Sequence, residues 1–150
     1  MSLFHTFNIS ASALTANRLR MDVVASNIAN AQTTRAQYVN GQWQPYRRKI
    51  VELVPQNQSR FEQIFQSKRR GSAALGGVVV RSIRNDQSPF KLVYDPYHPD
   101  ANEEGYVQMP NVDLVKEMVD LMSISRAYEA NVTVLNGTKQ MYLKALEIGK

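Results

Sequence analysis

Hydrophobic residues recur at alternating spacings of three and four near both ends of the chain. The N-terminal series comprises Phe4, Phe7, Ala11, Leu14, Met21, Ala25 and Ile28, with an interruption at Arg18. The C-terminal series comprises Leu114, Met118, Leu121, Ser125, Tyr128, Val132, Leu135, Lys139, Tyr142 and Leu146. This heptad pattern is typical of helices that pack along one apolar seam. The sequence therefore predicts a long helix at each end.

Local residues indicate where these helices begin and end. Pro110 precedes the C-terminal series, and Asn111 or Asp113 can cap the helix that follows. At 1.5 Å per residue, that helix would be roughly 50 Å long. The stretch 23–34, VVASNIANAQTT, continues the N-terminal pattern. We expect it to be helical throughout, and we expect the two helices to pair antiparallel.

The middle of the chain has a different pattern. Three short segments are rich in β-branched or aromatic residues and are separated by proline and glycine: 47–54, 77–83 and 90–94. They predict strands of a small β-rich module.

The expected fold class is α+β. Long N- and C-terminal helices pair as an antiparallel coiled coil, with the small β-rich module inserted between them. We expect residues 1–36 and 112–150 to form the helical domain. Residues 37–111 would form the middle module, with a mobile loop at 55–76 that is either irregular throughout or includes a short helix around 61–65.

Parts of both predicted helices have no charged residues, although solvent-exposed helix faces usually carry them. The stretch 23–34 has no charged residue and places Asn27 and Asn30 away from the seam, and 130–138 is also uncharged. On an exposed face Lys, Glu or Arg would be usual, because Asn is a poorer helix former. Helices that are uncharged on several sides are expected to be buried on several sides. We therefore expect neighbouring subunits there, the alternative being burial within a compact monomer.

Composition limits the possible classes. The chain has 150 residues, 43% of them hydrophobic, and no cysteine, so disulfide frameworks and thiolate metal sites are excluded. The N-terminus lacks a basic region followed by an apolar core, and no apolar run approaches the roughly 20 residues of a spanning helix. If the protein leaves the cytoplasm, we expect another route to carry it.

The net charge of +5 permits binding to nucleic acid. The basic clusters at 46–49 and 68–70 have no alternating aromatic residues and no convincing recognition helix, so solvated loops are favoured. A basic nucleic-acid-binding protein with a coiled-coil dimerisation element stays open as the alternative function.

Candidate chemistry is sparse. Asp100, Asn102, Glu104 and Gly105 begin like a calcium loop, but the Glu needed at position twelve is replaced by Asn111, so an acidic turn before a strand is favoured. The two histidines have no partner at ligand spacing. No nucleophile with a base is apparent. We predict that the chain is not an enzyme and has no catalytic, cofactor-binding or metal-binding residues.

Two segments resemble a known family. SALTANRLRMDVVASNIANAQTT, at 12–34, resembles the N-terminal signature of bacterial flagellar rod and hook proteins. Residues 88–141 are similar to the C-terminal half of the flagellar basal-body rod proteins, and YDPYHPDANEEGYV narrows the likeness to the proximal rod. The region 55–76 departs from the family pattern. A different rod or hook subunit is the nearest alternative.

The resemblance implies a structural subunit of the basal-body rod, outside the cytoplasmic membrane. It implies export by the flagellar type III system and helical assembly through the terminal helices, which transmits torque and forms the export channel wall. The implied partners are other rod subunits, further copies of the chain and the export apparatus. The resemblance implies no nucleic-acid partner and no membrane-spanning segment.

On this interpretation the seam and the uncharged helix faces are assembly contacts. The expected residues are Leu14, Met21, Asn27, Ile28, Asn30, Leu114, Met118, Leu121, Tyr128, Asn131, Val132, Leu135, Asn136 and Tyr142. Isolated helices of this kind are marginal in water, so we expect the chain ends to order on assembly.

Overall fold

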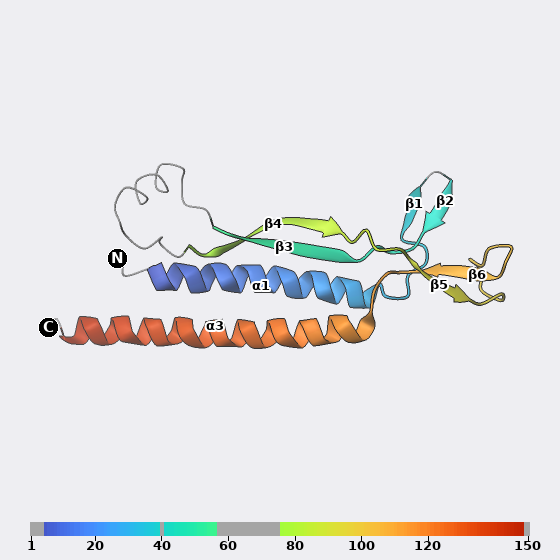
Figure 1. Ribbon diagram of the computed structural model, residues 1–150. Helices are drawn as coiled ribbons and strands as arrows, with labels where there is room; N and C mark the ends of the chain where they lie inside the picture. The colour runs from blue at the N-terminus through green and yellow to red at the C-terminus, as the bar shows by residue number, and fades with distance from the viewer. Residues whose placement is uncertain (1–4, 40, 57–75, 149–150) are drawn as a thin grey trace, which may run out of the picture. The chain divides into compact units, whose positions relative to one another are not determined.

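A computed structural model describes residues 5–39, 41–56 and 76–148. In these ranges a long helix near each end of the chain precedes and follows six short strands (Figure 1). The elements are α1 (His5–Ala29), β1 (Gln37–Val39), β2 (Gln42–Gln44), β3 (Lys49–Pro55), β4 (Val78–Asn85), β5 (Lys91–Tyr94), β6 (Tyr106–Met109) and α3 (Leu114–Ile148). The α+β class is confirmed, and the strands expected at 47–54, 77–83 and 90–94 correspond to β3, β4 and β5.

The chain divides into two compact units, and each contains parts of both helices. Unit 1 comprises Met1–Leu19, Glu52–Ser82 and Ser125–Lys150, and unit 2 comprises Arg20–Val51 and Ile83–Ile124. The loop expected at 55–76 lies almost entirely outside the described residues. Unit 2 contains the contacts that position the start of α3.

Helix α1 ends earlier than its pattern predicted. The expectation of a helix through 23–34 is wrong for the last five residues, because α1 stops at Ala29. The Asn30 amide donates to the Ser26 carbonyl (2.9 Å), and the Thr33 hydroxyl donates to Asn30 Oδ1 (3.3 Å). These side chains compete with the helical hydrogen bonds and turn the chain.

Helix α3 begins where a cap was expected. Asp113 Oδ1 accepts the backbone amides of Val115 (3.1 Å) and Lys116 (3.3 Å), which have no partner inside the first turn. Asp113, one of the two predicted candidates, is therefore the N-cap, and α3 is 35 residues long.

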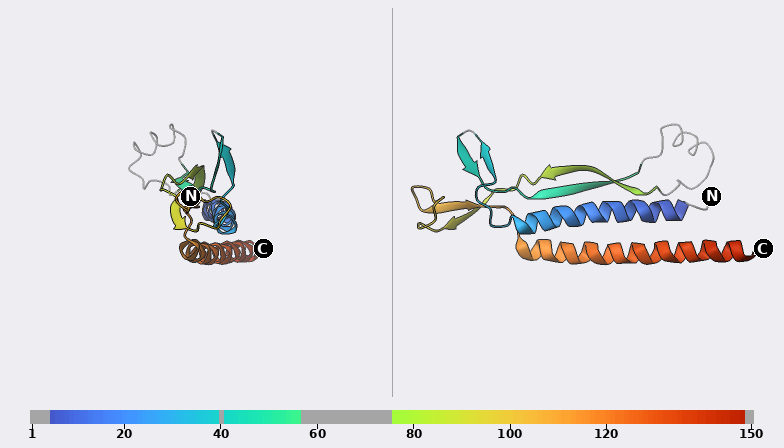
Figure 2. Two further views of the ribbon diagram at one scale, coloured as in Figure 1. Left: turned by 90° about the vertical axis from the view of Figure 1, so that its right-hand side faces the viewer. Right: turned by 180° about the vertical axis from the view of Figure 1, so that it is seen from behind.

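The strands of the described residues form three two-stranded sheets, β1–β2, β3–β4 and β5–β6. The β1–β2 hairpin was not predicted, although its Asn-Gly dipeptide at 40–41 is a strong hairpin signal. Gly41 has a φ of 84°, and the rings of Tyr38 and Trp43 lie 5.2 Å apart across the strands. In unit 2 this hairpin and the β5–β6 hairpin form separate ribbons (Figure 2).

The β5–β6 hairpin is antiparallel, and Tyr94 lies opposite Tyr106. Gly105, with a φ of 81°, ends the connection just before β6. This positive φ favours glycine, and a Cβ at Gly105 would also lie 3.0 Å from the Tyr94 ring, which would have to shift slightly. The acidic turn before a strand, expected at 100–105, is confirmed by this geometry.

The buried stripe of α3 is not the predicted one. The predicted positions Leu121, Tyr128, Leu135 and Tyr142 are half-buried, but four others are exposed: Leu114, Met118, Lys139 and Leu146. The most buried residues of α3 are instead Glu117, Ile124 and Thr138, each one position before a predicted one. Hydrophobic periodicity missed this face because its first member is a carboxylate. Pairing of α1 and α3 as a coiled coil stays a prediction.

Candidate assembly site

A buried polar cluster in unit 2 joins the end of α1 to the start of α3. Asn27 and Glu117 are each 1% exposed. The Asn27 amide donates to the Lys49 carbonyl (2.9 Å) and to Glu117 Oε2 (3.0 Å). Asn27 Oδ1 accepts the Lys49 backbone amide (2.9 Å) and the Tyr46 hydroxyl (3.0 Å). All four hydrogen-bonding positions of the amide are therefore used inside the chain.

Arg48 completes the cluster. Its Nε donates to Glu117 Oε1 at 2.6 Å, and its Nη1 lies 3.3 Å from Asp86 Oδ2. Burial disfavours the charge of Arg48, but hydrogen bonds and charge attraction from Glu117 and Asp86 outweigh it and raise the guanidinium pKa. The basic segment 46–49, expected to be a solvated loop, is therefore partly built into the fold. The second basic cluster, 68–70, lies outside the described residues.

Both carboxylate oxygens of Asp86 have partners that favour its ionised form. The Ser88 hydroxyl and backbone amide donate to Asp86 Oδ1 at 2.6 and 2.9 Å, and Arg48 lies at the other oxygen. Hydrogen bonds from Ser88, followed by that from Arg48, lower the pKa of Asp86 below its ordinary value. The cluster is thus a charged network whose members depend on one another.

This cluster determines which side of α3 faces outward. Glu117 lies in the first turn of the helix, and a paired carboxylate there cannot rotate to the surface without breaking its contacts with Arg48 and Asn27. Removing one partner of a buried ion pair typically costs about 3–5 kcal/mol. The first three turns of α3 are therefore held in one orientation within unit 2.

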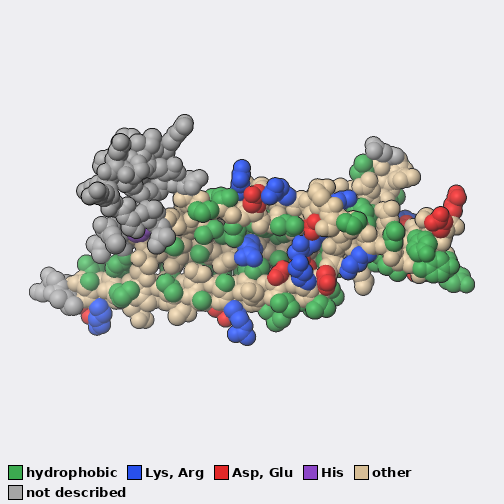
Figure 3. Space-filling view, viewed as in Figure 1, with side chains coloured by type: hydrophobic (Ala, Val, Ile, Leu, Met, Phe, Trp, Pro, Cys, Tyr) green, Lys and Arg blue, Asp and Glu red, His purple; other side chains and the backbone are tan. Residues whose placement is uncertain are grey.

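The opposite side of these turns carries an exposed apolar stripe. We use this name for Leu114, Val115, Met118, Val119 and Met122, which are 44%, 72%, 50%, 55% and 58% exposed. Their spacing places them on adjoining rows of one helix face. Figure 3 shows hydrophobic side chains on the surface at the start of α3. Contiguous apolar patches of this kind mark interaction surfaces, and methionine adapts its shape to a partner.

The other expected assembly residues are dispersed along the two helices. Most are half-buried: Leu14, Met21, Ile28, Asn30, Leu121, Tyr128, Asn131, Val132, Leu135 and Tyr142. Asn136 is exposed, whereas the Asn131 amide donates to the Ala127 carbonyl of its own helix at 2.8 Å. Asn27 is satisfied within unit 2. Their contacts with neighbouring subunits stay predictions.

Sequence inspection missed part of this site. Val115, Val119 and Met122 lie off the heptad seam, so they were noticed as apolar but not counted as interface residues. Arg48 and Glu117 are 69 positions apart in the sequence, so no short sequence motif indicates that they pair. Only folding brings these residues together.

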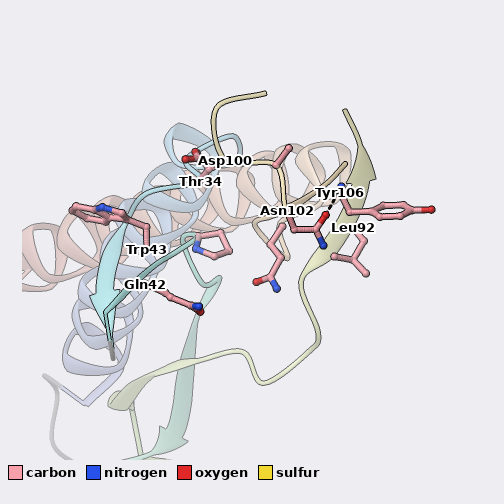
Figure 4. Close-up of a pocket in the computed structure, with 10 residues that line it drawn as sticks. Thr34, Gln42, Trp43, Leu92, Asp100, Asn102 and Tyr106 are labelled. Carbon is pink, nitrogen blue, oxygen red and sulfur yellow. Dashed lines mark hydrogen bonds between the residues drawn. The ribbon is translucent and has the colours of Figure 1, made fainter. Parts of the chain in front are cut away.

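The residues that resembled a calcium loop instead shape a turn (Figure 4). Asp100 accepts hydrogen bonds from Arg35 Nε (2.6 Å) and the Thr34 hydroxyl (2.8 Å), and these bonds lower the pKa of its carboxyl. Asn102 Oδ1 accepts the Tyr106 amide at 2.7 Å. Among the residues that the structure describes, no three His, Cys, Asp or Glu side chains gather as a metal site.

No helix in the described ranges combines the length and apolar character needed to cross a membrane.

Comparisons with known proteins agree across the whole chain. Residues 7–37 match the flagella basal body rod protein family, and residues 103–148 match the C-terminal family of flagellar basal body rod FlgEFG proteins. The chain is 62% identical to the flagellar basal-body rod protein FlgC of Bacillus subtilis (strain 168), covering 100% of both chains. It is 46% identical to FlgC of Escherichia coli O6:H1 over 100% of both.

A third relative shows a similar extent of likeness. FlgC of Borreliella burgdorferi is 45% identical over 99% of this chain and 98% of its own. The N-terminal match contains the whole of segment 12–34, and the C-terminal match covers the later part of segment 88–141, from residue 103 onward. The chain belongs to the FlgC family of flagellar basal-body rod proteins.

Proposed function

We propose that this chain is built into the basal-body rod through side-by-side packing of its terminal helices with other rod subunits and with further copies of itself. As a member of the FlgC family it is a structural protein of the flagellar basal body, and it is not an enzyme. The observation that carries the packing proposal is the exposed apolar stripe of α3. The buried ion pair between Arg48 and Glu117 fixes the orientation of the first turns of α3, so the stripe stays on the exposed side of the helix.

The energetics favour a covered stripe. Burial of apolar surface contributes about 25 cal/mol per Å², and each of the five side chains retains a large exposed area. A neighbouring subunit that packs against the stripe removes this area from water. The polar and half-buried positions farther along α3, including Val132 and Asn136, would extend the same contact.

Export as an unfolded chain through the flagellar type III apparatus is the second part of the proposal. It rests on family resemblance and on the small core of the described residues, among which few large side chains are fully buried. After assembly the helices would form the wall of the export channel and transmit torque along the rod.

The test is to replace Met118 and Met122 with lysine and to measure incorporation into purified basal bodies. Two charges on the stripe should reduce incorporation roughly tenfold or more, because each buried unpaired charge costs several kcal/mol. Ser123→Lys is the matched control, since it adds a charge to the same helix at an exposed position outside the stripe.

Folding of the purified variants is checked by circular dichroism. Normal incorporation of a folded Met118→Lys, Met122→Lys variant would contradict the proposal. Equal loss with Ser123→Lys would show that added charge alone, and not the stripe, is responsible.

A further inference from the structure

The β5–β6 hairpin ends in an acidic turn. Residues 95–104 contain four of the chain's 13 acidic residues and none of its 18 basic residues. Of these four, Asp100 pairs with Arg35. Within the described part of the chain, Asp95, Glu103 and Glu104 have no cationic partner. Figure 3 shows acidic side chains beside hydrophobic ones at this end of unit 2.

One face of the same hairpin is apolar and exposed. Leu92 and Tyr94 on β5 are 66% and 65% exposed, Tyr106 opposite Tyr94 is 41% exposed, and Tyr97 in the turn is 97% exposed. A two-stranded hairpin is marginally stable in water, and exposed tyrosine is characteristic of protein interfaces. We refer to residues 91–109 as the acidic hairpin. Its composition indicates a protein partner with a basic surface.

Unit 2 also contains a basic cleft of about 640 Å³. Three cationic residues line it, Arg35, Arg47 and Lys49, together with the polar side chains of Asn30, Thr33, Gln37, Gln44, Asn85 and Gln87. None of the described residues that line this cleft is acidic.

Two of these cations have no carboxylate partner. The Arg47 guanidinium lies 4.5 Å from the centre of the Phe90 ring and donates to the Asp86 carbonyl at 3.2 Å. Lys49 Nζ lies 5.9 Å from the centre of the Tyr46 ring. In the described ranges neither is within 4.0 Å of an acidic side chain. Both charges are therefore available to an incoming carboxylate.

We propose that the acidic hairpin of one copy of this chain docks in the basic cleft of a second copy. The two surfaces have opposite charge, and the cleft supplies amide donors and acceptors for the backbone of the turn. The acidic turn would repel nucleic acid or an anionic lipid surface, which leaves a basic protein surface as the partner. This chain, with a net charge of +5, supplies one.

The geometry of such a contact favours helical assembly. The hairpin and the cleft are different surfaces, so the contact is heterologous and leaves one of each free for the next copy. A contact of this type repeats without closing unless the rotation between copies forms a ring. The inference rests on the proposed rod function and adds a second contact between copies, independent of the exposed apolar stripe.

Cysteine cross-linking tests this contact, because the chain has no native cysteine. Two differently tagged versions are produced in one motile strain, one with Glu103→Cys and one with Gln87→Cys. Basal bodies are purified and treated with a short bismaleimide. We expect a dimer that carries both tags and that is absent when either cysteine is omitted. The control pair is Glu103→Cys with Lys116→Cys, an exposed residue of α3 outside the cleft.

The outcomes separate this inference from the proposed function. Basal bodies that contain both versions but no doubly tagged dimer would overturn the hairpin contact and leave rod membership intact. A dimer of equal yield with the control pair, or cross-linking only to a different basal-body protein, would also overturn it. Loss of both versions from basal bodies would instead contradict assembly of the tagged chain into the rod.

Charge exchange provides a second measurement. Glu104→Lys or Lys49→Glu alone should lower the yield of the cross-linked dimer roughly two- to fivefold, the range for an exposed pair made repulsive. The combination of both changes should restore the yield. Failure of the combination to restore it, with both chains folded, would contradict a direct pairing of the turn with the cleft.

Discussion

Asn27 occupies a position in the interior of α1 where alanine would be the better helix former. Four hydrogen bonds explain its presence, since the amide satisfies both backbone groups of Lys49 and also contacts Glu117 and Tyr46. The Asn27 side chain therefore links α1 to β3 through Lys49 and to α3 through Glu117.

Asn27→Ala should therefore lower the free energy of unfolding by about 2–4 kcal/mol, because it leaves buried polar groups without partners. Chemical denaturation followed by circular dichroism measures the change. The matched control is Asn136→Ala, at an exposed position of α3, which should change stability by no more than about 0.5 kcal/mol. Equal effects of the two substitutions would contradict the role assigned to the cluster.

Helix α3 has different surroundings along its length. Its first turns, as far as Ile124, belong to unit 2 and bury Glu117 and Ile124. In the part that belongs to unit 1, Thr138 is the only described residue that is fully buried, and its hydroxyl donates to the carbonyl of Val134 in the same helix. Four large apolar side chains there are exposed: Val134, Met141, Leu143 and Leu146.

Hydrogen exchange should therefore be faster at 125–148 than at 114–124 in the dilute monomer, because few buried contacts protect the later turns. Mass spectrometry of pepsin fragments measures the difference. In purified basal bodies the later turns should become protected. Uniform strong protection of α3 in the monomer would refute the expectation that this end orders on assembly.

The whole molecule should lose stability in acid. The pKa values of Asp86 and Asp100 are lowered from the ordinary 3.8, so the folded chain binds fewer protons than the unfolded chain near that pH. Their contribution is complete above the unfolded value and disappears as the pH falls through the folded values. The free energy of unfolding should therefore decrease below about pH 4.

Urea denaturation at a series of pH values between neutral and acidic measures this loss. Asp86→Asn should be less stable than the parent chain at neutral pH and should show a shallower decrease in acid, since one of the two groups no longer titrates. A parent chain whose stability is constant through this range would contradict the pKa directions.

Local sequence pattern was sufficient for most elements. The terminal helices, the cap at Asp113 and the strands β3, β4 and β5 follow from periodicity, β-branched content and turn residues, because these properties act over a few neighbouring positions. The family signature was also readable, since it consists of continuous segments. The Asn-Gly signal of the β1–β2 hairpin was present but was not used.

The orientation of each helix was decided by contacts between residues distant in sequence. Hydrophobic spacing placed Met118 on the inner face of α3, whereas the structure buries Glu117 and exposes Met118. A carboxylate can occupy the inner face only because Arg48 and Asn27 reach it, 69 and 90 positions away. Periodicity assumes that buried positions are apolar, so it cannot anticipate a buried ion pair. Tertiary structure alone therefore determined which residues of α3 remain exposed.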